Sequence, residues 1–294
     1  MTSSVEKTTP SAARLAYDTL EPFHVVAYFN PGLGDAFRDT GLDPHAFYVG
    51  ARGAPLGSCA PSVVTSTFYN FSPDLISKAW TAALGVGLDT VTARRDAMLD
   101  EQLRAILGDA ADDSSIAELT AGYRDLAVGL PLGGRALAAG WAAAAPPESP
   151  VVALWYAIAV LREWRGDNHI AALVLNGLHG IDAVVFHEAQ LPDPTVKRRV
   201  LGRKMVQLTR GWSDDDWDGS VARLADRGLV DRGEDGHVLT ADGAAVYDDI
   251  EATTDALGES VWSVPGASDL VTRTRPLVKA VLDAGVLPGT KKKG

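Results

Sequence analysis

The stretch GWSDDDWDGSVARLADRGLVDRGEDGHVLTADG, residues 211–243, decides the fold of the C-terminal part of the chain. Ser213 precedes a helical pattern and Asp216 follows it by three residues, which predicts a capped helix N-terminus. Residues 230–239 surround a Gly-Glu-Asp-Gly turn and predict a two-stranded hairpin. Thr240 then begins another helix, because threonine is a favoured N-cap residue.

The elements around this stretch predict a winged helix. A helix over 197–208 precedes it and the helix after Thr240 extends to about Leu257, which gives the order helix, helix, hairpin, helix. Upstream, a helical period dominates from about residue 11. We therefore expect a mainly α protein with four parts: a flexible arm (1–10), a helical bundle domain (11–194), a winged-helix domain (195–265), and a C-terminal helix with a basic tail (266–294).

The composition is that of an ordinary globular protein without disulfides. The chain has 294 residues, of which 46% are hydrophobic and 22% are charged, and its formal net charge is −11. No apolar run has the length of a membrane span, and no N-terminal segment has the apolar core of a signal peptide. Cys59 has no second cysteine to pair with, which fits a reducing compartment. We expect a cytoplasmic protein, with a homodimer as its assembly.

Several strings along the chain resemble an actinobacterial family with a helical N-terminal domain and a MarR-like winged-helix C-terminal domain. The resemblance extends over about residues 20–265. It implies this two-part architecture and carries no settled reaction or ligand. The strings are GARGAPLG (50–57), FYNFSPDLI (68–76), LREWRGDNHIAAL (161–173), RGWSDDDW (210–217), RLADRGLV (223–230), LTADG (239–243) and IEATTDALGESVW (250–262).

The charges of the expected recognition helix and wing argue against DNA as a partner. The helix over 213–228 holds five aspartates against two arginines, and the wing over 230–239 holds three acidic residues against one arginine. Proteins bind DNA by neutralising phosphates with lysine and arginine, so these surfaces add repulsion. We therefore expect the winged helix to serve packing or dimerisation. The alternative is a ligand-responsive MarR-like transcription regulator whose DNA-facing edge is lined by Arg210, Arg223, Arg227 and Arg232.

The stretch LREWRGDNHIAALVLNGLHG, residues 161–180, places ionisable groups between two apolar runs. The pattern predicts two helices, 150–164 and 168–188, that meet at a corner at Gly166. At such a corner Asp167 is expected to cap the second helix, with His169 in its first turn. These residues then either form an ordinary charged rim or line a pocket.

In the pocket interpretation each charged residue of this stretch has a role. Arg162 or Arg165 binds an anionic group, and Glu163 or Asp167 orients His169, which acts as an acid, a base, or a metal or haem ligand. On one straight helix His169 and His187 lie roughly 27 Å apart, so they are not expected to share a metal ion.

A second candidate segment, residues 46–66, is rich in glycine, proline and small residues and predicts an extended loop. Arg52 in this segment suits bidentate binding of a carboxylate or phosphate. Tyr69 and Asn70 are expected to face the same cavity, where they donate and accept hydrogen bonds. The competing interpretation makes Tyr69 a core aromatic and Asn70 a capping residue.

These observations lead to one main hypothesis: a small-molecule-binding protein with a polar pocket in the helical domain, whose catalytic activity stays open. Its catalytic candidates are His169, Glu163 and Asp167, and its ligand-binding candidates are Arg52, Tyr69, Asn70 and Arg162. The expected ligand is anionic or aromatic. Haem stays open as a cofactor, whereas the absence of HExxH and of a cysteine pair argues against a structural metal site. A structural or interaction protein without chemistry is the third hypothesis.

Overall fold

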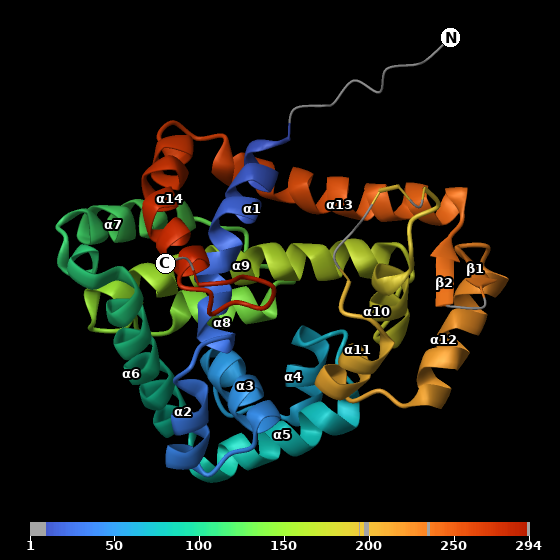
Figure 1. The fold of residues 1–294 in the computed structure, drawn as a ribbon, viewed down its shortest axis with the longest axis horizontal. Coiled ribbons are helices and arrows are strands. Elements are labelled where there is room, and N and C mark those ends of the chain that lie inside the picture. Colours follow the sequence, from blue (N-terminus) through green and yellow to red (C-terminus); the bar gives the residue numbers. More distant parts are fainter. Residues whose placement is uncertain (1–9, 194, 197–199, 234–235, 293–294) are drawn as a thin grey trace.

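The computed structural model describes residues 10–193, 195–196, 200–233 and 236–292, and most of them are helical (Figure 1). The mainly α prediction is therefore confirmed. The first half of the chain contains α1 (Ala12–Val25), η1 (Val26–Tyr28), α2 (Leu33–Thr40), α3 (Pro44–Gly53), η2 (Ala54–Leu56), α4 (Pro61–Thr67), α5 (Pro73–Val86), α6 (Leu88–Leu107), η3 (Gly108–Asp112), α7 (Ser115–Ala127) and α8 (Ala136–Ala143).

The second half contains α9 (Pro150–Leu175), α10 (Ile181–Glu188), α11 (Arg203–Arg210), α12 (Asp214–Asp226), β1 (Val230–Gly233), β2 (Gly236–Leu239), α13 (Ala241–Trp262) and α14 (Ala267–Asp283). Most of the expected arm, the two central residues of the hairpin turn and the end of the basic tail lie outside the described residues, as do residues 197–199 of the helix expected over 197–208. None of the helices in the described ranges combines the length and the apolar composition needed to cross a membrane.

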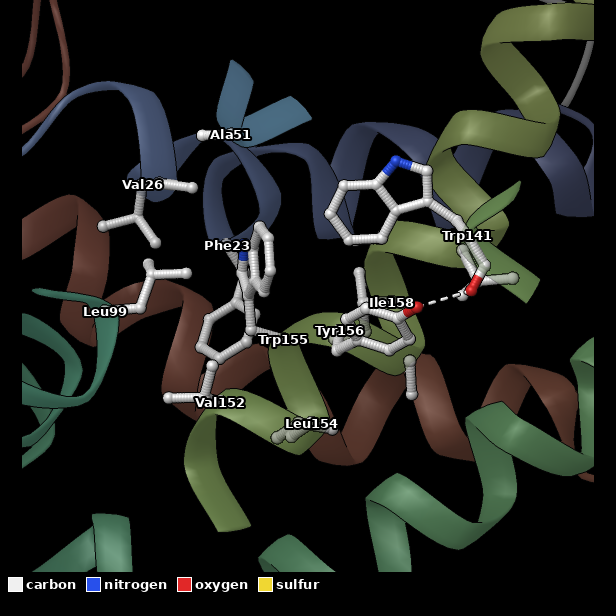
Figure 2. Packing of buried hydrophobic residues seen from close by; sticks show 14 of the residues in the cluster. Phe23, Val26, Ala51, Leu99, Trp141, Val152, Leu154, Trp155, Tyr156 and Ile158 are labelled. Carbon is white, nitrogen blue, oxygen red and sulfur yellow. Dashed lines mark hydrogen bonds between the residues drawn. The ribbon is translucent and has the colours of Figure 1, made fainter. Parts of the chain in front are cut away.

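Helix α9 is the axis of the first and larger hydrophobic core, and it runs through the middle of the molecule (Figure 1). Trp155 and Ile158 on this helix are fully buried against Phe23 of α1 and Trp141 of α8 (Figure 2). The hydroxyl of Tyr156 donates a hydrogen bond of 2.5 Å to the carbonyl oxygen of Trp141. Because side chains of this size bury 150–250 Å² each, the aromatic cluster contributes much of the packing free energy of this core.

The prediction of two helices meeting at a corner at Gly166 is wrong, because α9 continues through it from Pro150 to Leu175. A single glycine costs a helix only about 1 kcal/mol, and burial of apolar side chains on both sides of Gly166 outweighs that cost. The chain breaks instead at Gly177 and Gly180, whose φ angles are 63° and 47°. Both glycines lie inside the helix predicted over 168–188, and their left-handed conformation interrupts it.

The prediction of an extended loop over 46–66 is also wrong, since α3, η2 and α4 occupy most of it. Its small residues serve close helix packing. A Cβ atom on Gly50 would lie 2.8 Å from the Cβ of Ala83, and one on Gly53 would lie 3.0 Å from the ring of Trp80. Glycine is therefore required here by the approach of α5, and α3 forms despite it.

A second, smaller core joins α10, α12, the β1–β2 hairpin and the first half of α13. The capping box of Ser213 and Asp216 is confirmed, and Thr240 caps α13 through a hydrogen bond from the backbone N–H of Gly243. The strands pair antiparallel, with Val230 opposite Leu239. This core takes in α10, which precedes the domain boundary expected at residue 195. Helix α14 packs on the first core, through residues such as Val278 and Val281.

Candidate ligand-binding site

A cavity of about 490 Å³ lies where α11 meets the first core. We call it the aromatic cavity, because its walls carry many rings: His24, Tyr28, Phe29, Phe37, His45, Phe47, Tyr48 and Phe71. Its charged lining residues are Glu21, Arg52, Arg162, Glu163 and Arg210. A few polar groups on a largely apolar wall and a volume of this size are typical of small-molecule sites.

Arg52 and Glu163 form a bidentate ion pair in the wall of this cavity. The Nε and Nη2 atoms of Arg52 donate to the two carboxylate oxygens of Glu163 at 2.8 and 2.7 Å, and Glu163 is only 2% exposed. Burial by itself would raise the pKa of Glu163, but the charge and hydrogen bonds of Arg52 outweigh burial and hold that pKa below its usual value. Both side chains are therefore charged.

His24 lies beside this pair and is neutral. Its Nε2 atom is 4.0 Å from Oε1 of Glu163, and its ring stacks on Trp155. Burial, together with the charge of Arg162, lowers the pKa of His24 to about 4. Its Nδ1 atom is buried and has no hydrogen-bond partner among the described residues, and the same holds for the hydroxyl of Tyr28.

Arg162 is also paired. It donates hydrogen bonds to both carboxylate oxygens of Glu21, one of them 3.0 Å long from its Nη2 atom. Its guanidinium lies 4.8 Å from the ring centroid of Tyr17. Of the two interpretations of this charged stretch, rim or pocket, Arg162 fits the pocket, because it lines the cavity while its ion pair with Glu21 joins α9 to α1.

A second cavity of about 260 Å³ shares Arg52, Arg162 and Gly166 with the aromatic cavity. We call it the histidine cavity, since His169 and His187 both line it. Because the chain turns at Gly177 and Gly180, the expected separation of roughly 27 Å along one straight helix does not apply to these histidines. Within the described ranges, no group of three histidine, cysteine, aspartate or glutamate residues is placed to hold a metal ion.

Five residues that the sequence singled out line this second cavity together: Arg52, Tyr69, Asn70, Arg162 and His169. Tyr69 donates a 2.5 Å hydrogen bond from its hydroxyl to the carbonyl oxygen of Leu178, and it has a positive φ of 27°, which is rare for a residue with a side chain. The carbonyl oxygen of Asn70 accepts a 3.0 Å hydrogen bond from the indole N–H of Trp212.

His169 is oriented by Thr254 rather than by the carboxylates we expected. Its Nδ1 atom lies 3.1 Å from the hydroxyl oxygen of Thr254, and that hydroxyl donates to the carbonyl oxygen of Ile250. Because the Thr254 hydroxyl proton is used in this way, its oxygen accepts from His169, which places the proton of the neutral imidazole on Nδ1. Burial lowers the pKa of His169 to about 4, although the carboxylate of Glu251 acts in the opposite direction.

Asp167 does not cap the helix that follows it, because it lies in the middle of α9. Its carboxylate instead accepts a 2.9 Å hydrogen bond from the backbone N–H of Ala138, in the first turn of α8. It lines neither of the two cavities described above. Burial raises its pKa to about 6. Asp167, Glu163 and His169 thus have separate partners, and the structure does not bring these three together as one catalytic group.

Most of the arginines that we expected along a DNA-facing edge bind other groups of the chain, although Arg223 and Arg227 stay exposed. Arg223 pairs with Asp182 at 2.6 Å, and Arg227 donates 2.8 Å hydrogen bonds to backbone carbonyls at the end of α9. Arg210 lines the aromatic cavity, whereas Arg232 is exposed on β1. In sequence, Arg210 gave no sign of this position, since it follows a short amphipathic run like any surface arginine.

The chain was compared with known proteins. No curated protein and no solved structure matches it. A model described as that of a helix-turn-helix family matches residues 13–288. That range is nearly the whole chain, so the protein belongs to this helix-turn-helix family.

Proposed function

We propose that the protein binds a small molecule in the aromatic cavity, between the first core and α11. The observation that carries this proposal is a pair of buried polar atoms, Nδ1 of His24 and the hydroxyl oxygen of Tyr28, which lack a hydrogen-bond partner among the described residues. More than nine in ten buried polar groups in proteins have a partner, so two such atoms beside one cavity favour a ligand that supplies it.

The second core serves in this proposal as a MarR-like winged helix that closes the cavity. Its order of elements is α10, α11, α12 and the β1–β2 hairpin. Gln190, between α10 and α11, exchanges backbone hydrogen bonds with His237 and Leu239 and so adds a third short segment beside β2. Thr209 and Arg210 of α11 form part of the cavity wall. Ligand and winged helix are therefore in direct contact.

A DNA-binding regulator is the alternative, and membership of a helix-turn-helix family favours it. The acidic surface of α12 argues against DNA binding. Arg203 of α11 is already paired with Asp214 and Asp218, and Asp215 stays exposed, so this surface would repel phosphates. Binding of a labelled duplex, followed by fluorescence anisotropy at 50 and 200 mM salt, separates the two. We expect no binding at either salt concentration. Tight binding that weakens steeply with salt would support the regulator.

Native mass spectrometry of freshly isolated protein tests the ligand proposal. We expect a retained small molecule in the wild type and its loss in Thr209→Trp, where an indole fills part of the cavity. Thr272→Trp is the matched control, because Thr272 is exposed on α14 and, like Thr209, donates its hydroxyl hydrogen bond to a carbonyl four residues earlier.

The same three proteins can be compared if the ligand dissociates during purification. Wild type and both variants are then incubated with the small-molecule extract of the source cells and measured again. The proposal is refuted if the wild type acquires no additional mass, or if both tryptophan variants retain the same molecule as the wild type.

A further inference from the structure

Arg210 is the one cation in the wall of the aromatic cavity that has no acidic partner in the described part of the chain. It is the last residue of α11, and its carbonyl oxygen accepts a 2.8 Å hydrogen bond from the backbone N–H of Ser72. Its guanidinium carbon lies 4.2 Å from the ring centroid of Phe71. Stacking occupies a face of the guanidinium and leaves its in-plane N–H groups available for a bidentate acceptor.

The charges of the cavity wall do not balance. The carboxylate of Glu163 is taken by Arg52, and that of Glu21 is taken by Arg162. Arg210 is therefore in excess, so the wall carries one uncompensated positive charge. The carboxylate of Glu188 attracts Arg210 electrostatically without forming an ion pair with it. This carboxylate is bound instead to the backbone N–H of Gly202, at 2.7 Å. Burial lowers the pKa of Arg210, which is the effect expected for a cation that has lost water without gaining an anion.

The remainder of the wall suits a flat apolar group. Tyr48 and Phe71 are stacked at 5.7 Å, and Tyr28 meets Tyr48 edge-on at 5.0 Å. Phe37 and Phe47 form a further edge-to-face pair at 5.5 Å. Aromatic rings prefer such offset and edge-on contacts, so a ring system entering this wall can extend the existing pattern.

We propose that Arg210 binds the carboxylate of an aromatic monocarboxylic acid, whose ring packs among Tyr28, Tyr48 and Phe71. The assignment rests on the proposed function and names the chemical class of its ligand. One carboxylate neutralises the one excess charge, and the ring replaces water along the aromatic wall. The ligand thereby contacts η1 and α3 in the first core and α11 in the second.

Isothermal titration of three acids, benzoate, 2-naphthoate and indole-3-acetate, tests the assignment, with each acid compared with its uncharged primary amide. In the wild type we expect at least one acid to bind at least tenfold more tightly than its amide. Arg210→Met should weaken that acid at least tenfold and leave its amide within twofold, because only the charged contact is lost. Arg232→Met, which removes an exposed arginine, should change neither the affinity for the acid nor the affinity for its amide.

A second variant protects the test against misfolding. Arg210→Lys keeps the charge but lacks the bidentate fork, so we expect a loss of acid binding smaller than that of Arg210→Met. Equal binding of acid and amide, or acid binding that neither Arg210 variant weakens, overturns the role of Arg210. Failure of all three acids to bind also overturns it. A molecule retained by the wild type and lost in Thr209→Trp then shows that the proposed function survives, whereas its absence shows that both have failed.

Discussion

Substitution of Glu163 by glutamine tests how the first core holds its charges. In Glu163→Gln the guanidinium of Arg52 keeps its charge, yet it loses a carboxylate partner that is 2% exposed and bound through two hydrogen bonds. Removing one partner of a buried ion pair typically costs about 3–5 kcal/mol, because the other charge stays behind without compensation. His24 offers no replacement, because an imidazole carries no negative charge in either of its protonation states.

Urea unfolding at pH 7, followed by tryptophan fluorescence, measures this loss. With a slope of about 3 kcal/mol per molar urea, the midpoint should fall by about 1 M or more. Glu118→Gln is the matched control: Glu118 pairs with Arg273 at the surface, with side chains 65% and 39% exposed, so its substitution should cost less than about 1 kcal/mol.

The double variant Arg52→Met, Glu163→Leu distinguishes two free energies: the cost of burying one unpaired charge, and the net contribution of the ion pair to stability. Because both charges are removed, it should be more stable than Glu163→Gln. The reasoning is refuted if Glu163→Gln costs no more than Glu118→Gln, since Arg52 would then be adequately solvated without its partner.

Three further predictions concern backbone packing and pH. Gly243→Ala should lose about 3 kcal/mol or more in unfolding free energy, because its Cβ would lie 1.9 Å from the carbonyl oxygen of Leu229, whereas Gly219→Ala, on the open side of α12, should be neutral or gain up to about 1 kcal/mol; chemical denaturation of both compares them. The folded state holds His24 neutral, with a pKa of about 4 against about 6.5 when unfolded, so the wild type loses stability as pH falls through this window; His24→Gln should remove about 3 kcal/mol of that loss, measured by denaturation at pH 7 and pH 4. For Asp167 the sign is opposite: its raised pKa of about 6 means that its stabilising effect is complete below about pH 4 and is lost as pH rises through 6, so Asp167→Asn should gain up to about 3 kcal/mol on the wild type at pH 7 and nothing at pH 4, and equal gains at both pH values would contradict this.

The parts of the fold that the sequence predicted well are those that neighbouring residues determine. Ser213 and Asp216 bind one another's backbone across a single turn, and Thr240 binds the N–H of Gly243, so no distant contact is needed to place these caps. The C-terminal helix expected within 266–294 is observed at Ala267–Asp283 for a similar reason, because a sustained amphipathic pattern marks it.

The errors arose where tertiary contacts decide between local alternatives. Asp167 is a residue type that often caps helices, and it does bind the N-terminus of a helix. That helix is α8, because the carboxylate accepts the N–H of Ala138, which lies 29 residues earlier in the chain. The same holds for Gly50, where glycine reflects the approach of Ala83 rather than a loop. Capping and close packing use the same residue types as corners and loops, so one sequence cannot distinguish them without knowledge of the partner.

Arg162 and His169 were singled out for their charge between apolar runs, and Arg52 for its place in a segment of glycine, proline and small residues. All three line one cavity. Arg210 was missed as a cavity residue, because its place depends on how α11 meets the first core. A charged residue within an apolar helical segment can therefore be recognised from the sequence as a candidate site residue. A site that forms between two cores has no such pattern in either of the segments that build it.

The junction between the two cores runs through the segment 69–72, next to the cavity in which we propose that a ligand binds. Hydrogen bonds that cross here include those from the hydroxyl of Tyr69 to the carbonyl oxygen of Leu178, from the indole of Trp212 to the backbone carbonyl oxygen of Asn70, and from the N–H of Ser72 to the carbonyl oxygen of Arg210. A ligand shifts a conformational equilibrium only through contacts that differ between the two states. In the proposed complex, a carboxylate bound by Arg210 would add such a contact at the same residue and so stabilise the arrangement in which α11 closes the cavity. The positive φ of Tyr69 places backbone strain at this junction, and such strain persists only where the surrounding contacts maintain it.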